Sequence, residues 1–235
     1  MSILITQRKF NELYRIRLGE KSGGAPTSLV DSIRVTSPSV EVIKAFTSVY
    51  GGRPRKWSDA NQFQATLPIT RLPIMLLPGQ NLSQYMEHWK GSVCDRRCDG
   101  FRMEKFNGAP SEDICACGPD RPVDRRLCKP VTRLTVACPE VDLVGVGLLT
   151  TRSAIAVGEM EGQLSLAQPV LDAGRAVRGI LKVDRLVGAN KAFNVPRIEL
   201  VGLTFGELAE AQHPAQLAPA APAALTTGDD DGSPA

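Results

Sequence analysis

The chain of 235 residues is 43% hydrophobic, 23% charged and 5% aromatic, which suffices for one good core but is short for two large domains. Its net charge of +3 is uneven, because residues 206–235 contain acidic residues and no Lys or Arg. A mildly basic body with an acidic tail lacks the dense Lys/Arg clusters of a protein that grips DNA through many phosphates. No apolar run is long enough to span a bilayer, and Arg8 and Lys9 precede any long apolar stretch. We therefore expect a cytoplasmic protein with no signal peptide and no membrane partner.

Glycine and proline mark the ends of the first predicted strands and helices. Residues 1–18 form either an arm or a first strand, and the Gly- and Ser-rich residues 19–28 predict a flexible connection. A strand is expected over 30–35, and a helix then runs to Tyr50 before Gly51-Gly52, with Ser37 as its N-cap and Pro38 in its first turn. The inner face of this helix is predicted to carry Val42, Phe46, Val49 and Tyr50.

Two short segments, 63–67 and 72–77, predict strands whose flanking and internal prolines suit sheet edges. After them, four apolar residues recur at the spacing i, i+3, i+4 and i+7, which predicts a short amphipathic helix: Leu82, Tyr85, Met86 and Trp89. We expect its apolar stripe to face the core.

The second half of the chain predicts four strands, over 133–138, 143–149, 178–187 and 195–205. Residues 150–173 permit a helix that Gly158 and Gly162 weaken. Because no βαβ rhythm is present, the predicted class is α+β, a mostly antiparallel sheet with two or three helices. We expect one domain over 1–212, with a Cys-rich metal segment inserted at 91–130. The acidic Ala/Pro-rich residues 213–235 are expected to be disordered.

Five of the six cysteines fall within 35 residues: Cys94, Cys98, Cys115, Cys117 and Cys128. Without a secretory signal, such a cluster indicates metal binding before disulfides. The segment has few bulky apolar residues of its own, so a structural zinc ion can substitute for a core. Five cysteines are one too many for a single tetrahedral site, and the alternative is a set of reduced, partly buried thiols. Cys138, on an alternating strand, is expected to be a small buried apolar residue.

Basic and acidic side chains nearly balance within the Cys-rich segment. Arg96, Arg97 and Arg125 could contact a nucleic acid or the carboxylates of a protein partner, although such arginines are usually solvated. The sequence contains no phosphate-binding loop, dinucleotide fingerprint, zinc-protease motif or nucleophile elbow. We therefore expect a protein that is not an enzyme.

Several stretches, in order, resemble the recombination directionality factor-like proteins of actinobacterial phages and integrated elements. They are Tyr14-Arg-Ile-Arg-Leu-Gly19, the Thr36-Ser-Pro-Ser39 helix start, Tyr50-Gly-Gly52, Leu82-Ser-Gln84 with Trp89, Arg96-Arg-Cys-Asp-Gly100, the following Cys-x-Cys, and Cys128-Lys-Pro-Val-Thr-Arg-Leu134. The resemblance covers roughly residues 8–205, and its cysteine block is the most specific part.

The resemblance implies a protein that binds a large serine integrase on its attachment-site DNA and switches it from integration to prophage excision in the bacterial host. It implies metal-type positions at Cys98, Cys115, Cys117 and Cys128, which leaves Cys94 as the surplus cysteine. Strong independent DNA binding is not expected. The alternative is a zinc-containing protein that binds single-stranded nucleic acid.

Overall fold

The structure is a computed structural model of the chain. It describes residues 12–20, 28–57, 61–79, 81–91, 93–104, 110–118, 120–122, 125–187 and 192–206. The tail predicted at 213–235 lies outside the described residues, as does the part of the N-terminal segment before residue 12.

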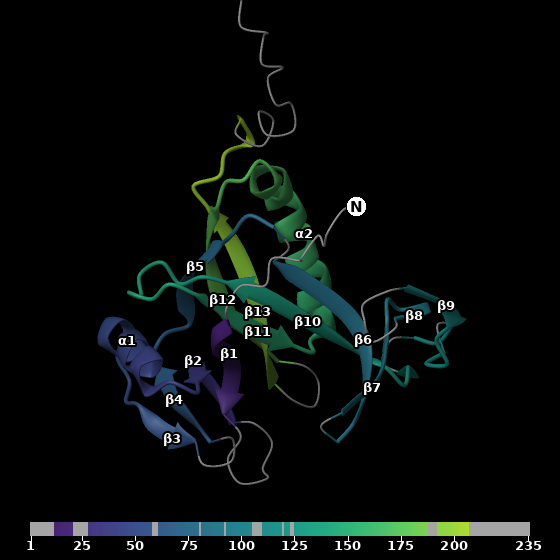
Figure 1. Cartoon of the computed structure of the whole chain (residues 1–235), viewed down its shortest axis with the longest axis horizontal. Coiled ribbons are helices and arrows are strands. Elements are labelled where there is room, and N and C mark those ends of the chain that lie inside the picture. The colour runs from purple at the N-terminus through teal and green to yellow at the C-terminus, as the bar shows by residue number, and fades with distance from the viewer. Residues whose placement is uncertain are drawn as a thin grey trace, which may run out of the picture.

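Ten strands form the larger sheet (Figure 1). In spatial order they are β3 (Arg55–Trp57), β4 (Gln62–Leu67), β2 (Ser28–Ser37), β1 (Glu12–Glu20), β11 (Val146–Thr151), β10 (Lys129–Val136), β6 (Leu82–Lys90), β7 (Val93–Cys98), β8 (Arg102–Glu104) and β9 (Pro110–Ile114). Neighbouring strands are antiparallel except β1 and β11, which pair in parallel. Of the two options for the N-terminal segment, the described part is therefore a strand, and it lies in the middle of the sheet.

The smaller sheet has the order β13 (Ala192–Val201), β12 (Val177–Val187) and β5 (Arg71–Leu76). β5 is an edge strand of this sheet, as Pro73 led us to expect. The same expectation is wrong for β4, which precedes Pro68 but lies between β3 and β2 in the large sheet. Helix α1 (Val40–Tyr50) packs against β4 and β2, while α2 (Ala154–Asp172) packs mainly against β13 and β10. The two helices and mostly antiparallel strands of the described residues confirm the predicted α+β class.

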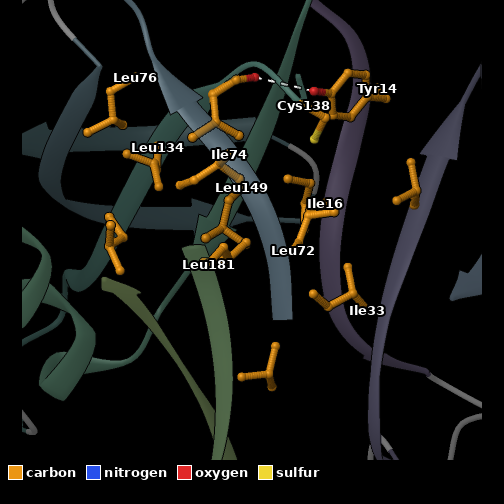
Figure 2. Close-up of a cluster of buried hydrophobic side chains, with 14 of the residues drawn as sticks. Tyr14, Ile16, Ile33, Leu72, Ile74, Leu76, Leu134, Cys138, Leu149 and Leu181 are labelled. Carbon is orange, nitrogen blue, oxygen red and sulfur yellow. Dashed lines mark hydrogen bonds between the residues drawn. The ribbon is translucent and has the colours of Figure 1, made fainter. Parts of the chain in front are cut away.

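The main core lies where the two sheets meet. Figure 2 shows side chains from β1, β2, β5, β10, β11 and β12 converging there, including Ile16, Leu72, Leu134, Leu149 and Leu181. Leu72, Ile74 and Leu76 are buried at alternate positions of β5, as the period of two in a strand requires. Cys138 belongs to this core, so its predicted role as a buried apolar residue is confirmed.

Tyr14 joins the core to the centre of the large sheet. Its ring meets that of Phe46 edge-on with centroids 4.7 Å apart, and its hydroxyl donates to the carbonyl of Val136 at 3.4 Å (Figure 2). The ring lies directly over Gly147, where a Cβ atom would come within 1.9 Å of Tyr14 Cε2. Glycine at this position therefore provides the space for the tyrosine ring.

Helix α1 begins later than predicted. Ser37 is the last residue of β2, where its hydroxyl donates to the Leu13 carbonyl at 2.7 Å and accepts from the Ser39 amide at 3.1 Å, and Ser39 is the N-cap. The helix ends at Gly51, as predicted, with a φ of 79°. Its buried face contains Ile43 beside Val42 and Phe46, whereas Val49 is 45% exposed, so the prediction of Val49 on the inner face is wrong.

The amphipathic helix predicted over 82–89 is wrong, since these residues form strand β6. This strand pairs with β10 on one side and β7 on the other, so its backbone hydrogen bonds are satisfied within the sheet. The apolar residues do not share one environment: Leu82 packs on the main core, Met86 packs among cysteines and Trp89 is 37% exposed. Their helical spacing over so few residues is fortuitous.

The predicted flexible connection at 19–28 is partly wrong, because residues 19 and 20 belong to β1 and residue 28 to β2. Residues 21–27 lie outside the described residues. No helix in the described ranges is long and apolar enough to cross a membrane.

Candidate metal centre

Four of the five clustered cysteines come together at one end of the large sheet. Cys98 ends β7, Cys115 and Cys117 follow β9 directly, and Cys128 precedes β10. All four side chains are buried, and their Sγ atoms lie within 4.8 Å of one another. In Figure 1, β8 and β9 project from the body of the protein at the end remote from α1.

Tight turns hold the four thiols in position. The carboxylate of Asp99 accepts hydrogen bonds from the backbone amides of Phe101 and Arg102 at 2.8 and 2.7 Å, and Gly100 takes a φ of 111°. This turn returns the chain so that the amide of Cys115 can donate to the Phe101 carbonyl at 2.8 Å. The turn chemistry thereby places Cys98 opposite the Cys-x-Cys pair.

The distances between sulfur atoms suit a tetrahedral ion. Sulfurs about 2.3 Å from a tetrahedral zinc would be about 3.8 Å apart, and the Cys98–Cys117 and Cys115–Cys128 pairs are both separated by 3.9 Å. All six cysteines of the chain are free, and 3.9 Å is far beyond the disulfide bond length of about 2.0 Å. The donor set therefore fits a structural metal ion bound by four thiolates.

Burial of two of the four thiols gives a further reason for a cation. Desolvation raises the pKa of Cys98 to about 12, and it also raises the pKa of Cys128. At these two positions the neutral thiol is therefore favoured without a compensating positive charge, whereas at Cys115 burial is outweighed by hydrogen bonds from Cys117 and its neighbours, which lower the pKa. The cluster is small and separate from the main core, and the other described apolar residues packed among its cysteines are Met86 and Met103. A divalent ion would supply both the missing charge and the missing cohesion.

Cys94, the surplus cysteine, is not part of this group. Its thiol is half-buried and donates to the carbonyl of Arg96 at 3.3 Å. Cys94 lies on β7 with Cys98, but the antiparallel pairing of β6 with β7 shifts register between His88 and Trp89, and Cys94 is placed opposite Trp89.

The three arginines predicted to contact a partner lie in different surroundings. Arg97 makes contacts within the protein, because its guanidinium pairs with Glu87 at 2.9 Å and lies 5.0 Å from the ring centre of Tyr85. Arg96 is half-buried, and its ion pair among the described residues is a long contact of 3.6 Å with Asp95. Arg125 is exposed.

The buried carboxylate of Glu87 was missed by the sequence analysis. It accepts two hydrogen bonds from Arg133, at 2.8 and 2.9 Å, and one from the indole of Trp89 at 2.8 Å. Burial raises the pKa of this carboxyl, but these hydrogen bonds and the charges of Arg133 and Arg97 outweigh burial and hold the pKa below its usual range. Glu87 therefore links β6 to β10 and β7 as an ion-paired anion.

A comparison with protein families gives one match. The family model described as Gp3-like, recombination directionality factor-like, matches residues 15–200. That range includes all four clustered cysteines and extends from β1 into β13. Comparisons with curated proteins and with solved structures gave no match.

Proposed function

The chain belongs to the recombination directionality factor-like family, and on that premise we propose that it binds a large serine integrase and switches it from integration to prophage excision. The match over residues 15–200 is the observation that carries this proposal. In the proposed role the protein catalyses no reaction and acts in the cytoplasm of the bacterial host, on an integrase bound to its attachment-site DNA.

The direction of recombination changes only if the protein discriminates between two integrase states. A ligand that binds both states equally shifts nothing, whereas about 1.4 kcal/mol of differential binding gives a tenfold bias. A modest interface on a rigid support is therefore sufficient.

We propose that the four buried cysteines bind one structural zinc ion that makes the projecting segment rigid. Four thiolates in a closed tetrahedron are typical of structural zinc and leave no open coordination position for catalysis. The ion would hold β8, β9 and the chain before β10 together where few apolar contacts do so.

The same segment offers the integrase a mixed apolar and basic surface. Among its described residues, large apolar side chains are exposed at Phe101, Ile114 and Leu127, to 49%, 61% and 48%, and Arg125 is exposed two residues before Leu127. Exposed apolar residues among charges are a common feature of protein interaction sites. Since Arg97 is held by Glu87, we favour Arg125 and Arg96 as the basic contacts.

The test is recombination in vitro by the integrase encoded on the same element, with and without this protein. We expect promotion of attL × attR recombination and inhibition of attP × attB recombination. An unchanged ratio of the two reactions at saturating protein would reject the directionality role.

A pair of variants separates the proposed surface from the proposed role. Arg125→Glu should weaken integrase binding without releasing metal, whereas Arg178→Glu on β12, an exposed arginine of the smaller sheet, serves as the charge-matched control. Unchanged binding in Arg125→Glu would reject this surface and leave the role to be judged by the recombination assay.

A further inference from the structure

The face of the large sheet turned away from the main core contains an open groove of about 700 Å³. Its walls come from β3, β2, β1, β11, β10 and β6, and its charged and aromatic lining consists of Arg15, Arg17, Arg34, Arg133, Arg152, Glu87, Trp57 and Trp89. The groove therefore crosses much of the sheet rather than following one strand.

The strand period of two explains why these side chains share a face. On β1, Arg15 and Arg17 alternate with the buried core residues Tyr14 and Ile16. Arg17 is directly opposite Arg34 in the antiparallel pair of β1 and β2, so two guanidinium groups lie side by side on this face. The sequence thus places a core on one side of the sheet and a basic groove on the other.

Carboxylates balance part of the positive charge of the groove, since Arg15 pairs with Glu12 at 2.6 Å and Arg133 pairs with Glu87 at 2.8 Å. Arg17 donates to the hydroxyl of Thr36 at 3.2 Å, and Arg34 donates to the amide oxygen of Gln64 at 2.9 Å. Arg152 has no side-chain partner among the described residues. Among the described residues, the lining contains one acidic residue, Glu87, and that carboxylate is already shared by Arg133 and Arg97.

The crowding of positive charge is reflected in the titration of Arg17. Desolvation lowers the pKa of its guanidinium, and repulsion from Arg34 and Arg15 lowers it further. A bound anion would relieve that repulsion.

Both tryptophans of the chain line this groove. The indole of Trp57 lies 5.1 Å from the guanidinium carbons of both Arg17 and Arg34, while Trp89 is 37% exposed and is fixed by its hydrogen bond to Glu87. The two indole rings, each in contact with neighbouring side chains, offer surfaces on which bases can stack, and the arginines around them can bind phosphates.

We propose that this groove binds single-stranded nucleic acid. At a strand spacing of about 4.8 Å, the path from β3 to β6 is roughly 29 Å long, which accommodates several nucleotides with phosphates near the arginines and bases stacked on the tryptophans. An acidic peptide would neutralise the arginine side chains but would supply no bases to stack on the two indole rings. The inference goes beyond the directionality role, because it concerns a different face and an unpaired strand rather than the integrase.

The test uses the full zinc-loaded chain and a fluorescently labelled oligo(dT) of twelve nucleotides. Fluorescence anisotropy should show binding, and the intrinsic tryptophan fluorescence should be quenched, since the protein has no tryptophan outside the groove. If about three phosphates are neutralised, the affinity should fall about 20-fold between 50 and 200 mM salt.

Variants assign the binding to the groove. Arg152→Glu should weaken binding at least tenfold, whereas the exposed control Arg178→Glu should change it less than twofold. Trp57→Leu should weaken binding at least fivefold through lost stacking, and Trp57→Phe should restore most of the affinity.

Four results would overturn the inference. They are the absence of binding to oligo(dT), an unchanged affinity in Arg152→Glu, equal binding and quenching by a polyglutamate of similar charge, and equal or tighter binding of a duplex of the same length. Recombination activity is measured separately, so loss of the directionality role would leave this result unaffected.

Discussion

Replacing one cysteine of the candidate metal centre tests both the ligand set and the role of the ion. In Cys128→Ser a buried thiolate becomes a poor ligand, while Cys94→Ser removes the nearby thiol that lies outside the cluster. Structural zinc binding contributes about 10–16 kcal/mol. If the four thiolates share this roughly equally, loss of one costs about 3 kcal/mol, or more than 100-fold in the dissociation constant for zinc.

The structure also predicts where the damage occurs. Apart from its cysteines, the described part of the cluster contains the buried Met86 and the half-buried Met103, and burying one methionine contributes about 1.5–3 kcal/mol. This is much less than the zinc contribution, so residues 93–128 should lose their fixed conformation while the separate main core stays folded.

Three measurements test this. Zinc content gives the number of ions per chain, competition with a chelator gives the affinity for zinc, and hydrogen exchange locates the residues that unfold. Wild-type protein and Cys94→Ser should each hold about one zinc, and Cys128→Ser should lose it and exchange faster over 93–128. Retention of zinc by Cys128→Ser with unchanged affinity, or equal loss from Cys94→Ser, would refute the assignment.

Three further predictions concern stability. Gly147→Ala should destabilise the fold by about 1–3 kcal/mol or more, because the added methyl group overpacks against the buried ring of Tyr14. Gly158→Ala, in open space on α2, should stabilise the fold by up to about 1 kcal/mol. Thermal unfolding in which both variants change the melting temperature in the same direction would contradict this prediction. Glu87→Gln should cost about 3 kcal/mol at pH 7, because two partly exposed arginines lose their buried partner. Because the pKa of Glu87 is lowered in the folded state, its contribution to the free energy of unfolding is fully present above the unfolded pKa of about 4.3 and is lost as the pH falls through the folded pKa. In urea denaturation, the difference in free energy of unfolding between wild type and Glu87→Gln should therefore become smaller below about pH 4. Deletion of 213–235 should leave the melting temperature unchanged, since that segment has no repeating apolar face, and a fall of several degrees would show that it docks.

Local signals in the sequence predicted most elements but not all of their boundaries. Glycine ended α1 where expected, and the alternating apolar residues of β5 and β12 are buried at alternate positions as a strand requires. The helix predicted over 82–89 failed because its four apolar residues satisfy a helical period by chance, while pairing with β10 and β7 determines the conformation. Such pairing depends on partners distant in the chain, which periodicity within eight residues does not report.

For the candidate site, clustering in the sequence was informative because the metal-type residues are close along the chain. It did not by itself distinguish Cys94 from the four cysteines that converge. The Glu87 network and the basic groove were not predicted. Glu87 meets Arg133 only after β6 pairs with β10, and Arg17 meets Arg34 through the register of the β1–β2 pair, which the separate strands do not specify. The missed signal is the alternation of arginine with apolar residues on β1, which in retrospect indicates one basic face and one buried face.

The central place of β1 in the large sheet has a consequence for synthesis on the ribosome. β1 can pair with β2 early, but its other neighbour, β11, comes about 130 residues later in the chain. At a rate of synthesis of about 5–20 residues per second, that edge of β1 stays unpaired for roughly 7 to 26 seconds. During this interval a strand edge with apolar residues such as Tyr14 and Ile16 is open to other chains, which makes the nascent protein most prone to aggregation before residue 151 has emerged.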